Sequence, residues 1–358
     1  MAHITENLAA WITAEKSPVM EVGPGPTPIP GDNEVVIKVA YAAVNPVDWK
    51  IQDHPPMPLP YPRVLGSDVA GTIVQLGANV TRFQLGQRAM GTATDSAKLE
   101  ETQHCMGLIT QNPSHAAFQN YCIVALPLVA EVPDNIPLAS AVVLPLALST
   151  AICALYKHLK LPFPTLEPVP VGKRILVWGG ASSPNENISG SLANERLAKA
   201  SGYEVITTAS PHNTAYVKSL GATSNFDYAD TQVIEKLLGV IRKGDVVFDA
   251  ISSPTSQALC AEIISKIGGG LLPVVDKLEA HAYENVKINS SHPGLVDLDI
   301  GEAVWGSYVP AALAAGKLLA KPEPMIIEGG LEKVQEGVNT LRQGVSAKKI
   351  VVEIAKEV

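Results

Sequence analysis

The sequence lacks the closely spaced cysteines that hold structural zinc or form redox-active pairs. Its four cysteines are Cys105, Cys122, Cys153 and Cys260, and the closest two lie seventeen positions apart. With no CxxC element, neither a zinc lobe nor a thioredoxin-like site is indicated. Isolated cysteines fit a protein whose thiols stay reduced, as they do in the cytosol.

Clusters of basic residues are also missing. The chain has 27 Lys and Arg against 35 Asp and Glu, a formal net charge of −8. Binding to nucleic acid or to an anionic membrane therefore has no support. Residues 1–11 lack a basic stretch followed by an apolar one, so we expect no signal peptide and a cytoplasmic protein.

One uncharged run is long enough to suggest a membrane span. Leu138 to Tyr156 contains nineteen residues without a charge, close to the ~20 that cross a bilayer. Pro145 interrupts the run, and Ser149 and Thr150 dilute it. We therefore predict two buried helices joined by a turn.

Length and composition predict two domains, because 358 residues exceed one ordinary core and 46% of them are hydrophobic. Residues 1–130 contain short strand patterns, such as 35–41 and 71–77, separated by Pro and Gly. This pattern predicts a mainly β domain. A last strand at 350–354 indicates that residues 300–358 return to complete it.

The middle of the chain, 131–299, has a different pattern. Helical stretches such as 212–220 and 233–241 alternate with β-rich runs. Such alternation predicts an α/β domain with a doubly wound parallel sheet. The predicted strands are 174–178, 203–208, 245–249 and 271–275.

The first of these strands runs into Gly179 and Gly180, followed by a helical segment. Glycines let the backbone approach a dinucleotide pyrophosphate, and the helix N-terminus attracts its charge. The spacing departs from GxGxxG, so an ordinary strand-to-helix turn stays open. The segment after Gly180 is long, and Asn194 and Glu195 stand where a buried apolar helix face is expected.

The end of the second strand distinguishes NAD from NADP. NAD sites place an acid there, but the segment from Thr208 to Asn213 contains none. Hydroxyl and amide groups can hold a 2′-phosphate instead. Lys218 in the next helix either adds positive charge to that site or is a solvated surface residue.

Several segments together carry a family resemblance over nearly the whole chain. They are AVNPVDWK at 43–50, LGSDVAG at 65–71, LPLALSTA at 144–151, GYEVI at 202–206 with SPHN at 210–213, LGA at 220–222 with FDY at 226–228, and SAKKIVV at 346–352. The chain resembles the zinc-free medium-chain dehydrogenase/reductases, in their quinone-reductase-like branch. Within it, the chain is most similar to the fungal trans-acting enoyl reductases of secondary metabolism.

The resemblance implies a GroES-like β domain, a Rossmann domain that binds NADPH, and an active cleft between them. Zinc alcohol dehydrogenases of this superfamily carry Gly-His-Glu where this chain has Gly66, Ser67 and Asp68. No metal ligand is therefore implied. Without a Lewis acid an alcohol is not readily converted to an alkoxide, so reduction of an activated C=C bond is favoured over alcohol oxidation.

The resemblance also implies site residues. Lys50 and Thr150 are the catalytic candidates, because they can stabilise the charge that builds on the acceptor carbonyl oxygen. Lys50 can instead pair with Asp48 or a cofactor phosphate. The implied substrate wall is Val143, Leu144, Leu146 and Leu148. The implied cofactor residues are Asn45, Pro46, Val47, Asp48, Trp49, Thr150, Gly180, Ser182, Ser183, Ser210, Asn213, Lys218, Tyr228, Pro273, Val274, Ser346 and Lys349.

We therefore expect an NADPH-dependent reductase that acts on a small or acyl-carrier-bound enoyl substrate, in trans with a polyketide synthase. Two alternatives stay open at this point. One is a quinone or small-enone reductase. The other is a non-catalytic, crystallin-like binding protein, because the unusual segment after Gly180 is compatible with a degenerate cofactor loop.

Overall fold

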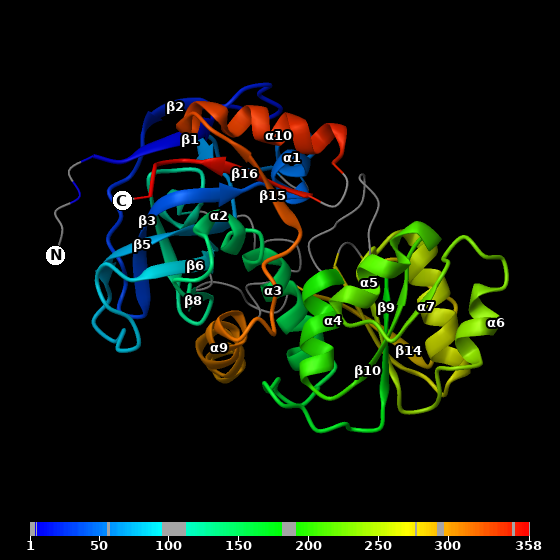
Figure 1. The fold of residues 1–358 in the computed structure, drawn as a ribbon. Coiled ribbons are helices and arrows are strands. Elements are labelled where there is room, and N and C mark those ends of the chain that lie inside the picture. Colours follow the sequence, from blue (N-terminus) through cyan, green and yellow to red (C-terminus); the bar gives the residue numbers. More distant parts are fainter. Residues whose placement is uncertain are drawn as a thin grey trace. The chain divides into compact units, whose positions relative to one another are not determined.

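The computed structural model (Figure 1) describes residue 4 and residues 6–357, except 56–57, 95–111, 181–190, 276–277, 292–296 and 346–347. For residues 191 and 192 it describes the backbone alone. The chain divides into two compact units. The first unit comprises Met1–Leu146 and Pro293–Val358, and the second comprises Ala147–His292.

The first unit contains a largely antiparallel sheet. In the described residues seven strands form it, in the order β15-β16-β3-β5-β6-β8, with β7 also paired to β3. A separate sheet has the order β2-β1-β4. The strands are β1 (Leu8–Ile12), β2 (Glu21–Pro24), β3 (Glu34–Ala43), β4 (Arg63–Val64), β5 (Asp68–Leu76), β6 (Arg88–Thr92), β7 (Tyr121–Ala125), β8 (Val129–Glu131), β15 (Glu323–Ile327) and β16 (Lys348–Glu353).

β16 joins the end of the chain to this sheet. It pairs antiparallel with β3, so that Val351 lies opposite Ala43. α10 (Val334–Gln343) follows a helical period, and its apolar face of Val334, Val338 and Leu341 is buried. The other helices of the unit are α1 (Pro46–Asp53), α2 (Leu138–Ala141), α8 (Leu298–Gly301), a π-helix (Glu302–Tyr308) and α9 (Val309–Ala314).

The second unit contains a parallel sheet in the order β11-β10-β9-β12-β13-β14. The chain starts at β9 and winds first to one side and then to the other, which is the Rossmann order. Figure 1 shows α4 and α7 on opposite sides of this sheet. The strands are β9 (Arg174–Trp178), β10 (Glu204–Thr208), β11 (Ser224–Phe226), β12 (Val246–Asp249), β13 (Gly270–Val274) and β14 (Val286–Ser290). The α-helices that lie wholly in this unit are α4 (Ser191–Ala200), α5 (Thr214–Leu220), α6 (Val233–Leu238) and α7 (Pro254–Lys266).

The predicted fold class, a GroES-like β domain with a doubly wound α/β domain, is confirmed. In sheets of this kind ligands bind outside the carboxyl ends of the strands, where the winding reverses. That point lies between β9 and β12, which are hydrogen-bonded neighbours. The fold therefore directs attention to the turns that follow β9 and β10.

The long apolar run belongs to the protein interior. In the described part of the chain, Leu138–His158 is helical, long and apolar enough to cross a membrane, but 94% of its most apolar window is buried. It contains α2, α3 (Pro145–Ile152) and a π-helix (Cys153–His158). The prediction of buried helices is confirmed.

Candidate cofactor site and active-site residues

A tightly bonded turn opens α1 in the first unit. Asn45 precedes the helix, Pro46 is its first residue, and the side chain of Asp48 reaches back to accept the backbone N–H of Asn45 at 2.7 Å. Asp48 also accepts the N–H of Gly66 at 3.2 Å. Burial raises the pKa of Asp48 to about 7, although these two N–H groups favour the charged form.

Asp68 is the centre of a buried polar network beside that turn. Its side chain is fully buried and accepts hydrogen bonds from Asn45 Nδ2 at 2.9 Å and the Leu146 N–H at 2.7 Å. Lys349 Nζ lies 3.1 Å from the same carboxylate and donates to Asn45 Oδ1 at 2.5 Å. One carboxylate therefore connects the start of α1, the first turn of α3 and strand β16.

We use the name Asp68 network for Asn45, Asp48, Asp68 and Lys349. Three of its members are predicted cofactor residues, and the structure brings them together. Asp68 has no predicted role, because the sequence marks it only as the place where zinc enzymes carry a glutamate. Lys349 is only 7% exposed. Its ammonium group contacts Asn45 and Asp68 inside the protein.

The rest of the 45–50 segment lies in α1. Pro46, Val47 and Trp49 are half-buried, and Val47 and Trp49 pack against the core of the first unit. Lys50 is half-buried in the same helix. The roles predicted for these residues beside the nicotinamide and the acceptor carbonyl stay predictions.

The predicted substrate wall is apolar and buried. Val143, Leu144 and Leu146 belong to the first unit, whereas Leu148 and Thr150 lie further along α3 in the second. Thr150 is 8% exposed. Their assignment to a substrate surface stays a prediction.

The turn after β9 has the tight geometry expected near a phosphate. Gly179 has a φ of +93°, and its N–H donates to Thr208 Oγ1 at 2.9 Å. The N–H of Gly180 donates to the Thr208 carbonyl at 2.9 Å. A Cβ added to Gly180 would lie 2.0 Å from Thr207 Oγ1, so a side chain cannot be accommodated without movement. A glycine-only turn at the end of the first Rossmann strand fits a dinucleotide. Ser182 and Ser183 lie outside the described residues.

Ser210, a predicted 2′-phosphate ligand, meets Tyr228, which is predicted to lie near the adenosine, at the carboxyl ends of β10 and β11. Ser210 Oγ and the Tyr228 hydroxyl lie 3.2 Å apart at an exposed position. The N–H of Asn213 donates to the Ser210 carbonyl at 2.9 Å, which folds the segment into a short turn. Lys218 is exposed on α5.

The remaining cofactor candidates lie elsewhere in the chain. Pro273 and Val274 end β13 and are buried, and the Val274 carbonyl accepts the N–H of Ser291 at 2.7 Å. Ser346 is outside the described residues. The role of each stays a prediction.

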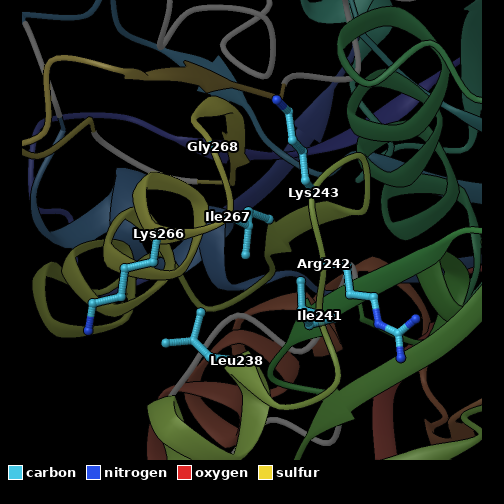
Figure 2. A pocket seen from close by; sticks show the side chains of 7 residues that line it. All are labelled: Leu238, Ile241, Arg242, Lys243, Lys266, Ile267 and Gly268. Atoms are coloured by element: carbon cyan, nitrogen blue, oxygen red, sulfur yellow. The ribbon is translucent and has the colours of Figure 1, made fainter.

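A surface pocket of about 570 Å³ lies at the opposite edge of the parallel sheet. Arg242 and Lys243 precede β12, and Gly268 precedes β13, so the pocket adjoins the amino ends of the strands. Figure 2 shows the charged ends of Arg242, Lys243 and Lys266 pointing in different directions. Lys266 also pairs with Glu262 at 2.6 Å. This pocket is therefore a poor candidate for the nucleotide site.

Within the residues that the structure describes, no three His, Cys, Asp or Glu side chains are grouped so that they could hold a metal ion. Among the described residues, Cys122, Cys153 and Cys260 form no disulfide, and all three are buried. Cys105 lies outside the described residues.

Comparisons with known proteins place the chain in a family. Residues 31–134 match the alcohol dehydrogenase GroES-like domain. The chain is 52% identical to trans-enoyl reductase himH of Aspergillus japonicus, covering 98% of both chains, and 31% identical to trans-enoyl reductase tndF of Aspergillus flavipes, covering 98% of this chain and 99% of that one. The solved quinone oxidoreductase from Coxiella burnetii has the same fold, with a TM-score of 0.68 at 22% identity over 98% of this chain and 100% of that one.

The match to the GroES-like domain and the similarity to trans-enoyl reductases, together with the Rossmann sheet, show that the protein is a nicotinamide-dependent oxidoreductase. The chain belongs to the medium-chain dehydrogenase/reductase superfamily, in the family of the fungal trans-enoyl reductases. The predicted resemblance is confirmed.

Proposed function

We propose that this protein is an NADPH-dependent reductase of an activated C=C bond that works in trans with a polyketide synthase. The relatives named trans-enoyl reductases, which match over almost their full length, support the reaction class. An enoyl group carried on the acyl carrier of a synthase is the substrate we propose, and the cytoplasm is the proposed compartment.

The end of β10 supplies the observation that supports NADPH rather than NADH as the cofactor. The Ser210 and Tyr228 hydroxyls lie 3.2 Å apart there, and the segment from Thr208 to Asn213 contains no acid. An acid at this position would bind the ribose hydroxyls of NAD and repel a 2′-phosphate. Two hydroxyl donors, with the Asn213 amide and the Lys218 charge nearby in sequence, suit a dianionic phosphate.

Other residues would hold the shared part of the cofactor. The Gly179–Gly180 turn would approach the pyrophosphate, with Ser182 and Ser183 as further proposed contacts. Residues 45–49, Pro273 and Val274 would border the nicotinamide, and Ser346 and Lys349 would close over the cofactor. When bound, the reduced nicotinamide supplies a hydride for the β-carbon of an α,β-unsaturated thioester.

The chain's own catalytic contribution is electrostatic. Negative charge builds on the thioester carbonyl oxygen during reduction, and the Lys50 ammonium and the Thr150 hydroxyl are proposed to stabilise it. The α-carbon takes its proton from solvent. Val143, Leu144, Leu146 and Leu148 are proposed to keep water from the acyl chain, as buried apolar side chains do.

A fluorescence titration with NADPH and NADH tests the cofactor assignment. We expect NADPH to bind at micromolar concentration and more tightly than NADH. Ser210→Ala should weaken NADPH binding about tenfold, because a hydrogen bond to a charged group contributes roughly 1.5 kcal/mol, and should leave NADH binding unchanged. Ser219→Ala, on the exposed side of α5, is the matched control. Tighter binding of NADH would contradict the proposal, and no binding at millimolar NADPH would favour a non-catalytic protein.

A further inference from the structure

A carboxyl group lies buried against the Gly179–Gly180 turn. Glu195 belongs to α4, and its side chain is completely shielded from solvent. A Cβ built on Gly180 would lie 2.3 Å from Glu195 Oε1. The carboxyl group therefore contacts the backbone of the turn itself, at a helix position where the sequence pattern calls for an apolar side chain.

The carboxyl group of Glu195 lacks the hydrogen bonds that usually accompany a buried acid. Among the described residues neither of its oxygens has a hydrogen-bond partner. The neighbouring Thr207 hydroxyl donates a hydrogen bond to the Val177 carbonyl, with an O···O distance of 2.9 Å. An ionised carboxylate without donors is expensive to bury, so the environment favours the neutral acid.

Few charges face Glu195 from the surrounding elements. Arg196 is next to it on α4, and Tyr216 faces it from α5. β9 and β10 present the Gly180 backbone and Thr207. Arg196 Nη2 donates to the Ser219 carbonyl at 3.2 Å. Burial raises the pKa of Glu195 to about 8, and the Arg196 charge only partly opposes this. The Thr207 hydroxyl lies beside the carboxyl group, but its hydrogen bond goes to the Val177 carbonyl.

We propose that Glu195 is a positioning residue for the cofactor, because the Gly179–Gly180 turn accepts the dinucleotide phosphates only while the Glu195 carboxyl carries a proton. An ionised carboxylate beneath the turn would place negative charge against the phosphates, in surroundings that screen charge weakly. It would also offset the positive end of α4. The inference rests on the proposed function and deepens it, because it makes cofactor binding depend on a proton.

The experiment measures the Kd of NADPH and of NADH by fluorescence between pH 7 and pH 9. If only the protonated protein binds, the Kd rises about tenfold over this range, as proton linkage with a pKa near 8 requires. The 2′-phosphate of NADPH has a pKa near ~6 and stays ionised throughout. NADH lacks that phosphate, so the same rise with NADH assigns the effect to the pyrophosphate turn.

Glu195→Gln keeps the shape of the side chain and cannot ionise. We expect its Kd to match that of the wild type at pH 7 and to change less than about twofold up to pH 9. Glu235→Gln, on an exposed position of α6, should retain the wild-type profile. The wild-type profile tests the inference even if Glu195→Gln does not fold.

Three outcomes separate the inference from the proposed function. A Kd that rises in the wild type and stays flat in Glu195→Gln supports the inference. A flat wild-type profile, or an equal rise in both proteins, overturns it while the proposed function stands. Failure of the wild type to bind NADPH at pH 7 overturns the proposed function itself.

Discussion

The two units bury acidic side chains in opposite ways. In the first unit the carboxylate of Asp68 receives two hydrogen bonds and lies 3.1 Å from the Lys349 ammonium. In the second unit Glu195 is as deeply buried, and among the described residues its oxygens have no hydrogen-bond partner. The burial of Asp68 is compensated by hydrogen bonds and an ion pair. The burial of Glu195 is compensated only if its carboxyl group stays neutral.

The difference shows what each acid contributes. In the Asp68 network the carboxylate fixes three segments that are distant in sequence, so its cost of burial is offset by partners. Asp48, with two backbone N–H donors, still has a pKa raised to about 7 by burial. Glu195 has a pKa raised to about 8. Each unit therefore contains a buried acid that can respond to pH, but only in the first unit does a buried carboxylate also hold segments together that are distant in sequence.

The largest expected effect comes from removing the cation of the Asp68 network. Lys349→Met leaves the Asp68 carboxylate buried without its ion-pair partner, and such a loss costs about 3–5 kcal/mol of unfolding free energy. Urea denaturation measures it. Lys348→Met, at the exposed neighbouring position of β16, should change stability by less than about 0.5 kcal/mol. A similar loss of unfolding free energy in Lys349→Met and Lys348→Met would show that the Asp68 network contributes no more to stability than an exposed lysine does.

A second effect appears in the pH dependence of stability. The pKa of Glu195 is raised from 4.5 to about 8 in the folded protein, so the folded state holds the proton more tightly and stability is lost as pH rises through this window. Between pH 6 and pH 8 the wild type should lose about 2 kcal/mol more than Glu195→Gln, since each pH unit corresponds to ~1.4 kcal/mol. Asp48 titrates in both proteins and cancels in the difference.

Chemical denaturation at a series of pH values checks this expectation without any cofactor. Glu235→Gln serves as the exposed control and should follow the wild type. Parallel pH profiles for the wild type and Glu195→Gln would mean that Glu195 is already ionised at pH 6, which contradicts the role of its burial.

The smallest effect compares two residues that precede helices. Ser253 begins α7 in the second unit and accepts the Ser256 N–H at 3.1 Å, so Ser253→Ala should cost about 1 kcal/mol. Asn45→Ala removes the acceptor of Lys349 and a donor to Asp68 as well, and should cost about 2 kcal/mol. Thermal unfolding of the two variants tests the order, and a larger loss for Ser253→Ala would contradict the account.

Much of the fold follows from local pattern. The apolar run at 174–178 predicts a strand, and β9 spans Arg174–Trp178, because a buried parallel strand is apolar on both faces. α1 is different, since the first 130 residues predict mainly β structure. Its helix depends on Asp48 bonding back to Asn45, and on the packing of α1 against α10, neither of which has a strong periodic signal.

The candidate site is only partly visible in the sequence. The glycines after β9 and the acid-free end of β10 are local features, so they can be found without a structure. Asp68, Leu146 and Lys349 meet only in the folded chain, which is why sequence reasoning gives Asp68 no role. Glu195 stands out as an acid in an apolar position, but its contact with Gly180 requires the fold.

The central claim is that this protein uses NADPH to reduce an activated C=C bond. Its most direct test is the initial rate of NADPH oxidation with a short enoyl thioester, measured beside the rate with a simple quinone. We predict turnover of the thioester to its saturated product, faster with NADPH than with NADH and faster than with the quinone. NADPH binding with no thioester reduction, or with turnover of the quinone alone, would contradict the account.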